Sequence, residues 1–335
     1  MIIDAFTHIY PPGFLEQLTE HSSGLGNLTE RMKSAGAVVN LEQRFSEMDP
    51  FGDYRQVIAL PHPVLEEVAT PGAATMLASV ANDAMAELCS QHPDRFAAFV
   101  ATVAMTDVDG AVVELRRAVT ELGAKGVQIY TNVVGRPLDD PEFEPMFATI
   151  ADLGVTTWLH PARTAAMTDY ATEERSRYEM WWCFGWPYET SVAMSRLVFA
   201  GVFDRYPTLR ILTHHLGGMV PYFDGRIGPG MEYLGSRTAD EDYSAVLDSL
   251  QRPHLDYFKM FYADTALFGS STGLSSGLQF FGADHVLFAS DAPFGPIAPT
   301  IAALDQVDLD PADRRKIMSG NAIELFGLDV ATEVS

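Results

Sequence analysis

Short apolar segments rich in β-branched and aromatic residues recur along the chain and alternate with segments of helical periodicity. Apolar residues three and four positions apart predict helices over Thr75–Gln91 and Asp109–Leu122. Because strands that alternate with helices form a parallel sheet, the pattern predicts an α/β fold, with the strands closed into a (β/α)8 TIM barrel. The predicted strands are Ile2–Phe6, Gln56–Leu60, Ala97–Val103, Gly126–Tyr130, Val155–His160, Arg210–His214, Met260–Asp264 and His285–Ser290.

Two segments break this alternation. Residues 11–47 follow the first predicted strand and are too long for one helix and its loops, so we interpret them as an insertion. Residues 161–190 are rich in aromatic side chains, and both segments are expected to lie over the C-terminal mouth of the barrel. Residues 1–335 are expected to form a single domain. The tryptophans of the aromatic segment are Trp181, Trp182 and Trp186.

A doubly wound open sheet is the rival architecture for such a pattern. It usually carries a glycine-rich phosphate-binding loop directly after its first strand. In this chain residues 7–12, Thr-His-Ile-Tyr-Pro-Pro, stand at that place. The sequence therefore favours the barrel.

Composition and charge narrow the class of protein. Of the 335 residues, 47% are hydrophobic, so the chain can bury a large core. No apolar run reaches the roughly 18 residues that span a bilayer, and residues 1–4 lack the basic start of a signal peptide, so we expect a cytoplasmic protein that does not bind a membrane. The net charge of −23 disfavours nucleic acid as a partner. Cys89 and Cys183 are interpreted as two buried thiols.

Residues that commonly bind metals stand at the ends of several predicted strands. His8 follows the first strand, His160 ends the fifth, His214 and His215 close the sixth, and Asp291 follows the eighth. Strand ends of a barrel converge on one mouth, so these side chains are expected to meet. Imidazole nitrogens and carboxylate oxygens are good ligands for zinc or manganese, and three protein ligands with an open position are typical of a catalytic site.

Simpler interpretations of these residues stay open. A single histidine at a strand end is more often hydrogen-bonded within the structure, and Asp291 could cap the helix after it. His62, after the second strand, is a weaker candidate for contact with a substrate. The remaining histidines are expected in loops or at the surface: His21, His92, His254 and His285.

Several sequence motifs carry a resemblance to a known family. They are Val155–Pro161, Phe184–Thr190, Gly201–Pro207, His215–Gly218 with Pro221, and Leu287–Pro293. In these motifs the chain resembles the amidohydrolase-related family, which includes 2-amino-3-carboxymuconate 6-semialdehyde decarboxylase and the γ-resorcylate decarboxylases. The resemblance covers nearly the whole chain and is specific to the family but not to a substrate. It implies a metal-dependent barrel enzyme.

The resemblance also implies roles for individual residues. His8, His160 and Asp291 would bind one divalent metal ion, zinc in the first place and manganese as the alternative, and His215 would be the catalytic histidine beside it. Asp291 would also take part in catalysis. Arg44 would bind a substrate carboxylate, and Arg226 would be lent across the interface of a homodimer. Two further substrate-binding candidates come from their places in the chain and not from the resemblance: His62 after the second strand and Trp186 in the aromatic segment.

One departure from the family pattern concerns the metal. The first strand of the family normally ends in His-x-His or Glu-x-His, but this chain has Phe6-Thr7-His8. Phe6 cannot bind a metal, so the site would hold its ion weakly or not at all. His214 is an extra imidazole that could substitute, but side chains alternate along a strand, so His214 is expected to point away from the mouth if His215 points into it.

The leading hypothesis is therefore decarboxylation of a small aromatic or unsaturated carboxylic acid. Arginines would bind the carboxylate, and His215 and Asp291 would move the proton that replaces carbon dioxide. Metal-dependent hydrolysis or hydration on the same barrel is the alternative. A binuclear site is not expected, because the fourth strand carries Gln128 and Tyr130 and no lysine follows it. A third hypothesis is a degenerate barrel that has lost its metal and only binds a ligand.

Overall fold

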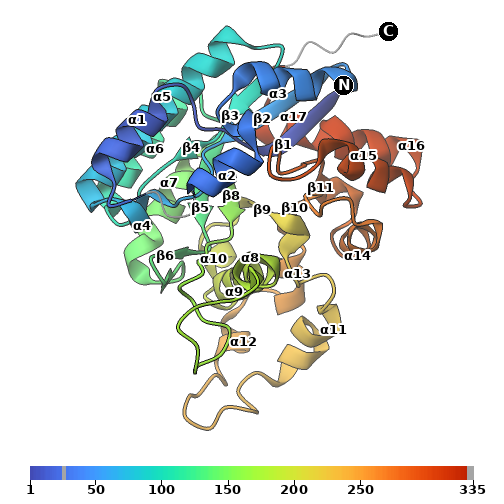
Figure 1. The fold of residues 1–335 in the computed structure, drawn as a ribbon. Coiled ribbons are helices and arrows are strands. Elements are labelled where there is room, and N and C mark those ends of the chain that lie inside the picture. The colour runs from blue at the N-terminus through green and yellow to red at the C-terminus, as the bar shows by residue number, and fades with distance from the viewer. Residues whose placement is uncertain (25–27, 330–335) are drawn as a thin grey trace.

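The computed structural model describes residues 1–24 and 28–329 of the chain, and parallel strands form its centre (Figure 1). These strands are β1 (Ile2–His8), β2 (Tyr54–Ala59), β3 (Phe96–Phe99), β4 (Ala101–Thr102), β5 (Gly126–Tyr130), β8 (Thr156–His160), β9 (Arg210–Thr213), β10 (Tyr262–Asp264) and β11 (Val286–Leu287). A short antiparallel pair follows β5 and consists of β6 (Asn132–Val133) and β7 (Arg136–Pro137). Each predicted strand is present, and the third is divided into β3 and β4.

Helices pack around these strands, with α1, α5 and α6 on one side and α15 and α16 on the other (Figure 1). The α-helices are α1 (Phe14–His21), α2 (Leu28–Ser34), α3 (Leu41–Met48), α4 (Leu65–Val68), α5 (Pro71–Gln91), α6 (Val108–Thr120), α7 (Glu144–Leu153), α8 (Met180–Cys183), α9 (Gly185–Phe199), α10 (Val202–Arg205), α11 (Asp224–Ile227), α12 (Val246–Ser249), α13 (His254–Phe258), α14 (Ser271–Phe281), α15 (Ile297–Asp305), α16 (Pro311–Arg315) and α17 (Asn321–Phe326). The shorter 3-10 and π turns are η1 (Gly36–Val38), η2 (Asp49–Phe51), η3 (Pro141–Phe143), η4 (His215–Gly217), η5 (Pro229–Tyr233), η6 (Ala283–His285) and η7 (Lys316–Gly320).

The strands pair in chain order, as successive β/α units require. In the described part of the chain, one parallel sheet has the order β1-β2-β3 and another has the order β11-β10-β9-β8-β5-β4. Backbone hydrogen bonds also join strands that belong to different sheets. The Ala5 N–H donates to the Phe288 carbonyl just after β11, at 2.8 Å, and the Lys125 N–H donates to the Phe99 carbonyl at 3.1 Å. The carboxyl ends of the strands therefore lie at one end of the sheet system.

Apolar side chains from the inner faces of the strands fill the centre. Trp158 of β8 is fully buried, its indole N–H donates to the Ala5 carbonyl at 2.8 Å, and its ring packs on Phe326 of α17. Phe6 belongs to the same cluster and is also fully buried. A larger cluster packs the helices against the outer faces of the strands. The residues at the strand ends therefore lie next to a buried apolar cluster that includes Phe6.

The two segments that break the alternation differ in structure. Residues 11–47 contain α1, α2 and most of α3, and Phe14 and Leu18 of α1 are fully buried. Residues 161–179 are irregular, and α8 and α9 follow them. No helix in residues 1–24 or 28–329 combines the length and the apolar character that crossing a membrane requires.

Candidate active site

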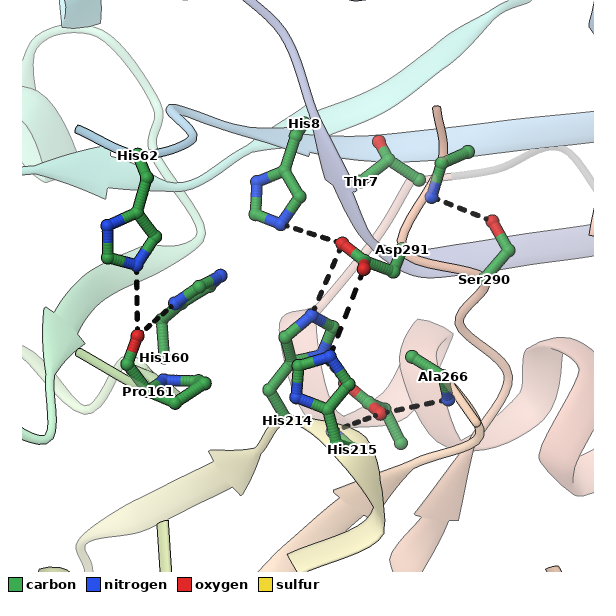
Figure 2. A network of polar contacts seen from close by, with 12 residues as sticks. Thr7, His8, His62, His160, Pro161, His214, His215, Ala266, Ser290 and Asp291 are labelled. Carbon is green, nitrogen blue, oxygen red and sulfur yellow. Dashed lines mark hydrogen bonds and ion pairs between the residues drawn. The ribbon is translucent and has the colours of Figure 1, made fainter. Parts of the chain in front are cut away.

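Four histidines and one aspartate meet at the carboxyl ends of β1, β8, β9 and β11 (Figure 2). His8 Nε2 lies 3.1 Å from Asp291 Oδ1, and His214 Nε2 lies 3.4 Å from the same oxygen. His215 Nε2 lies 3.8 Å from Asp291 Oδ2. The rings of His160 and His8 are 5.2 Å apart. The structure therefore brings together His8, His160, His215 and Asp291, as the sequence predicts.

The turn after β9 presents both of its histidines to this cluster. His215 and Leu216 have positive φ angles of 54° and 55°, which is rare for residues other than glycine, asparagine and aspartate. The next two residues are Gly217 and Gly218. A Cβ atom at Gly218 would lie 2.4 Å from the Pro187 carbonyl oxygen of α9, so only glycine lets the turn approach this helix. The glycines of the Leu-Gly-Gly motif are therefore needed for the backbone of this tight turn.

The expectation that His214 points away from the mouth is wrong. Its ring lies 3.8 Å from the ring of His215, 5.2 Å from that of His160 and 4.1 Å from that of Phe6, between centroids. Alternation of side chains holds only while the chain stays in a strand, but β9 ends at Thr213. The left-handed turn at His215 rotates the backbone, and both imidazoles enter the cluster.

Asp264, at the end of β10, holds this pair of histidines and was not singled out from the sequence. Its Oδ2 lies 2.5 Å from His214 Nδ1, and its Oδ1 accepts the backbone N–H groups of His215 at 2.9 Å and Ala266 at 3.1 Å. Asp264 is fully buried. One feature of the sequence could have indicated Asp264 as a site residue: the seventh predicted strand, like several others, ends in a residue that commonly binds metals.

His160 and His62 share one backbone acceptor on the other side of the cluster. His160 Nδ1 lies 2.8 Å and His62 Nε2 3.0 Å from the Pro161 carbonyl oxygen, so both nitrogens carry hydrogen as donors. Figure 2 shows the second ring nitrogen of His160 pointing toward the centre of the cluster. Burial, and then the neighbouring His62, His214 and His8, hold the pKa of His160 well below its ordinary value. A neutral imidazole is the form that binds metal.

The charges of Asp291 and His215 are set by their neighbours. Burial opposes ionisation of Asp291, but the imidazoles of His214, His215 and His8 beside it outweigh burial and hold the pKa of Asp291 well below its usual range. Burial, together with the nearby His214, lowers the pKa of His215. The cluster therefore combines a carboxylate with a neutral imidazole 3.8 Å away, which is a pair able to receive and pass on a proton.

The donor set fits a divalent metal ion. Ligand atoms of His8, His160 and His214 lie within 4.8 Å of one another, and so do those of His214, His215 and Asp291. Although buried, Nε2 of His214 and Nδ1 of His215 have no hydrogen-bond partner among the described residues. Buried polar atoms are normally satisfied, so unpartnered imidazole nitrogens in this cluster indicate a site for a cation.

A cavity of about 1290 Å³ adjoins the cluster. Trp186 and Phe294 line the cavity and also lie against the cluster. The Trp186 ring lies 5.5 Å from that of His160, and the Phe294 ring lies 5.9 Å from that of His8, between centroids. The cavity walls come mostly from the aromatic segment and include Tyr178, Trp181, Trp182, Arg175 and Arg177. The aromatic segment therefore lies beside the site and brings two arginines that the sequence analysis does not single out.

Arg44 is buried against β1 and β2 and does not line the cavity. Its guanidinium donates to Gln56 Oε1 at 2.7 Å, to the His8 carbonyl oxygen at 2.6 Å and to Thr7 Oγ1 at 3.1 Å, and only 2% of the residue is exposed. Burial lowers the pKa of Arg44 to about 10. These contacts support the backbone that carries His8. Binding of a substrate carboxylate by Arg44 stays a prediction.

Arg226 lies on the surface, away from the cluster. It is exposed, belongs to α11 and has its guanidinium 5.7 Å from the centre of the Phe223 ring. Within one copy of the described chain it does not join the site. Its predicted role requires a second copy and stays a prediction.

Comparison with known proteins places this geometry in a family. Residues 40–328 match the sequence model of the amidohydrolase family. The chain belongs to the amidohydrolase family. It is 31% identical to a 2-amino-3-carboxymuconate-6-semialdehyde decarboxylase of Dictyostelium discoideum over 263 residues, covering 78% of this chain and 69% of that protein. It is 32% identical to a γ-resorcylate decarboxylase of Polaromonas sp. strain JS666, covering 86% and 87% of the two chains.

A solved structure of another family member has the same fold. The 5-carboxyvanillate decarboxylase of Novosphingobium aromaticivorans, crystallised with manganese, superposes on this amidohydrolase with a TM-score of 0.83 at 26% identity. The match covers 98% of this chain and 96% of that one. The names of these relatives confirm the predicted likeness to the decarboxylase branch of the family.

Proposed function

We propose that this amidohydrolase is a metal-dependent decarboxylase of a small aromatic or unsaturated carboxylic acid. The observation that carries the proposal is the buried cluster of His8, His160, His214, His215 and Asp291 beside a cavity walled by tryptophans. Flat aromatic side chains suit a flat substrate, and a few polar groups at the end of the cavity suit the reacting carboxylate. The named decarboxylases among its relatives support the same activity.

The proposed architecture is a single-domain (β/α)8 barrel with an insertion at about residues 11–47. The hydrogen bond from Ala5 to Phe288 supports closure, because it joins the first strand to the residue after the last. In such a barrel the active site lies at the carboxyl ends of the strands, where the cluster is found.

One divalent ion would be held by His8, His160 and Asp291. Bound there, it would supply a Lewis acid that polarises an oxygen of the substrate and fixes its orientation. Manganese is the first ion to test, because the 5-carboxyvanillate decarboxylase was crystallised with it, and zinc is the second.

Proton transfer would fall to Asp291 and His215. In the proposed reaction the bond between the substrate carbon and its carboxylate carbon breaks and carbon dioxide leaves. The bonding electron pair stays on the substrate carbon, which takes up one proton. That proton would come from solvent and pass through His215, whose Nε2 lies 3.8 Å from Asp291 Oδ2, to Asp291 and on to the carbon, so that both groups end as they began, a neutral imidazole and a carboxylate.

Other groups would position the substrate and exclude water. Trp186 and His62 are stacked and would form one wall beside the reacting carboxylate. Arg44 would act mainly through His8, and Arg226 would reach the cavity of a partner subunit in a homodimer. A cytoplasmic location completes the proposal.

Product analysis tests the proposed activity. Protein loaded with Mn²⁺ is incubated with γ-resorcylate, 5-carboxyvanillate and other aromatic and unsaturated acids, and both carbon dioxide and the organic products are measured. We expect stoichiometric carbon dioxide and the decarboxylated product from at least one acid. Products of hydrolysis or hydration without carbon dioxide would instead support the alternative chemistry, and binding without turnover would support a degenerate barrel.

A further inference from the structure

We propose that His214, held by Asp264, is a metal ligand of this chain and takes the place that Phe6 leaves without one. The inference deepens the proposed function, since it rests on the metal site described there. It concerns a residue outside the predicted set of His8, His160 and Asp291.

The geometry around Phe6 supports this substitution. Phe6 and His8 are two residues apart on β1, so their side chains point to the same face of the strand. The Phe6 ring lies against the cluster, 5.4 Å from the ring of His8 and 4.1 Å from that of His214. An apolar ring thus stands where a second ligand from β1 would be, and the imidazole that packs directly on it is His214.

The two nitrogens of His214 have different surroundings. Nδ1 is 2.5 Å from the Asp264 carboxylate, whereas Nε2 is 3.4 Å from Asp291 Oδ1 and has no hydrogen bond within the described residues. Metal-binding histidines almost always donate their other ring nitrogen to a carboxylate or carbonyl, which fixes the tautomer. Asp264 would hold Nδ1 protonated, so that Nε2 is the nitrogen left to bind an ion in place of a proton.

The position of His214 among the other ligand atoms is also suitable. Its ligand atom lies within 4.8 Å of those of His8 and His160 in one group and of those of His215 and Asp291 in another. Asp291 meets His214 through Oδ1 and His215 through Oδ2. His214 belongs to both groups of candidate ligands. It would share one ion with His8, His160 and Asp291, while His215 would stay on the other carboxylate oxygen for proton transfer.

Pulsed electron paramagnetic resonance on the Mn²⁺-loaded wild-type protein tests the inference without any substitution. Nitrogen couplings count the imidazoles bound to the ion. We expect three, from His8, His160 and His214. Two bound imidazoles would overturn the role of His214 but leave the metal site of the proposed function intact. Failure of the wild-type protein to bind Mn²⁺ would overturn both.

A second test exchanges the side chains of Phe6 and His214. The measured quantity is the dissociation constant of Mn²⁺, obtained by competition with a chelator. His214→Phe is expected to weaken binding at least about 100-fold, since loss of an outer partner alone weakens metal binding about 10- to 100-fold. Phe6→His combined with His214→Phe puts an imidazole back and should recover most of the affinity. Asp264→Asn should weaken binding about 10- to 100-fold.

His254→Asn is the matched control. Contrary to the sequence expectation, His254 is buried, with Nε2 at 2.8 Å from the Ile227 carbonyl and 3.0 Å from that of Gly228, but it lies outside the cluster. Its replacement should leave Mn²⁺ affinity unchanged. Near-UV circular dichroism of each variant checks the fold before titration. A folded His214→Phe variant with wild-type affinity would overturn the inference.

Discussion

Asp4, in the first strand beneath the cluster, should make the free energy of unfolding depend on pH. It is fully buried and accepts hydrogen bonds from the Ser290 backbone N–H at 3.0 Å, from the Ser290 hydroxyl and from the Tyr54 hydroxyl. Burial outweighs these hydrogen bonds and raises the pKa of Asp4 from 3.8 to about 6. The folded state therefore binds this proton more tightly than the unfolded state.

The sign and size of the effect follow from this difference. A carboxyl whose pKa is raised on folding contributes stability that is complete below pH 3.8 and is lost as the pH rises through about 6. Each pKa unit corresponds to about 1.4 kcal/mol, so the loss is about 3 kcal/mol between pH 3.5 and 7. Asp4→Asn removes the titrating group. Relative to wild type, the variant should therefore gain about 3 kcal/mol of stability over this range.

Urea denaturation at half-unit steps of pH, followed by tryptophan fluorescence, measures this difference. Comparing variant with wild type at each pH cancels the other titrating groups, which are common to both proteins. Asp308→Asn is the control. Asp308 is exposed, so its side chain is in water in both the folded and the unfolded state, and its replacement should not make the stability difference depend on pH. A stability difference between Asp4→Asn and wild type that stays constant from pH 3.5 to 7 would refute the reasoning.

Three further predictions concern other parts of the molecule. Arg44→Lys should lower the free energy of unfolding by about 2–4 kcal/mol, because a lysine cannot donate hydrogen bonds to both Gln56 and the His8 carbonyl. Urea denaturation measures this loss. An unchanged stability together with a raised KM would instead favour direct binding of substrate by Arg44. His215→Asn should reduce carbon dioxide release at least about 100-fold while bound Mn²⁺, measured by elemental analysis, stays stoichiometric. Iodoacetamide should modify the exposed Cys183 of the native protein and leave Cys89 unmodified, because burial raises the pKa of Cys89 to about 12. Mass spectrometry of the peptides measures the modification of each thiol. Equal modification of both thiols would contradict the prediction.

Hydrophobic periodicity is enough to predict most of the fold and several residues of the candidate site. A run of apolar residues that stops at a polar side chain marks a strand end, and parallel strands bring their carboxyl ends together. His8, His160 and Asp291 are far apart in the sequence, yet His8 lies beside both of the others for this reason. Their meeting needs only the order of the elements, so it is predictable without knowledge of side-chain packing.

The remaining residues depend on backbone turns and packing that periodicity does not report. His214 enters the cluster because the chain leaves the strand at Thr213 and turns left-handed at His215. Asp264 is one carboxylate among many until its contact with His214 is known. Cys183, expected in the core, is exposed because α8 is a short helix beside the cavity and not a core element.

Arg44 illustrates a further limit of sequence reasoning. A guanidinium beside an active site suggests binding of a carboxylate, but here its partners include the backbone carbonyl of His8 and the side chains of Gln56 and Thr7. A carbonyl partner leaves no trace in the residue types of the sequence. Only the structure separates an arginine that supports the wall from one that lines the cavity, such as Arg175.

The most direct test of metal-dependent decarboxylation is a titration of chelator-treated protein with Mn²⁺, following the rate of carbon dioxide release from whichever acid the product analysis identifies. We expect no release without the ion, a rate that rises linearly up to one Mn²⁺ per chain, and no response in an Asp291→Ala variant. A rate that is the same before and after Mn²⁺ is added would contradict the account.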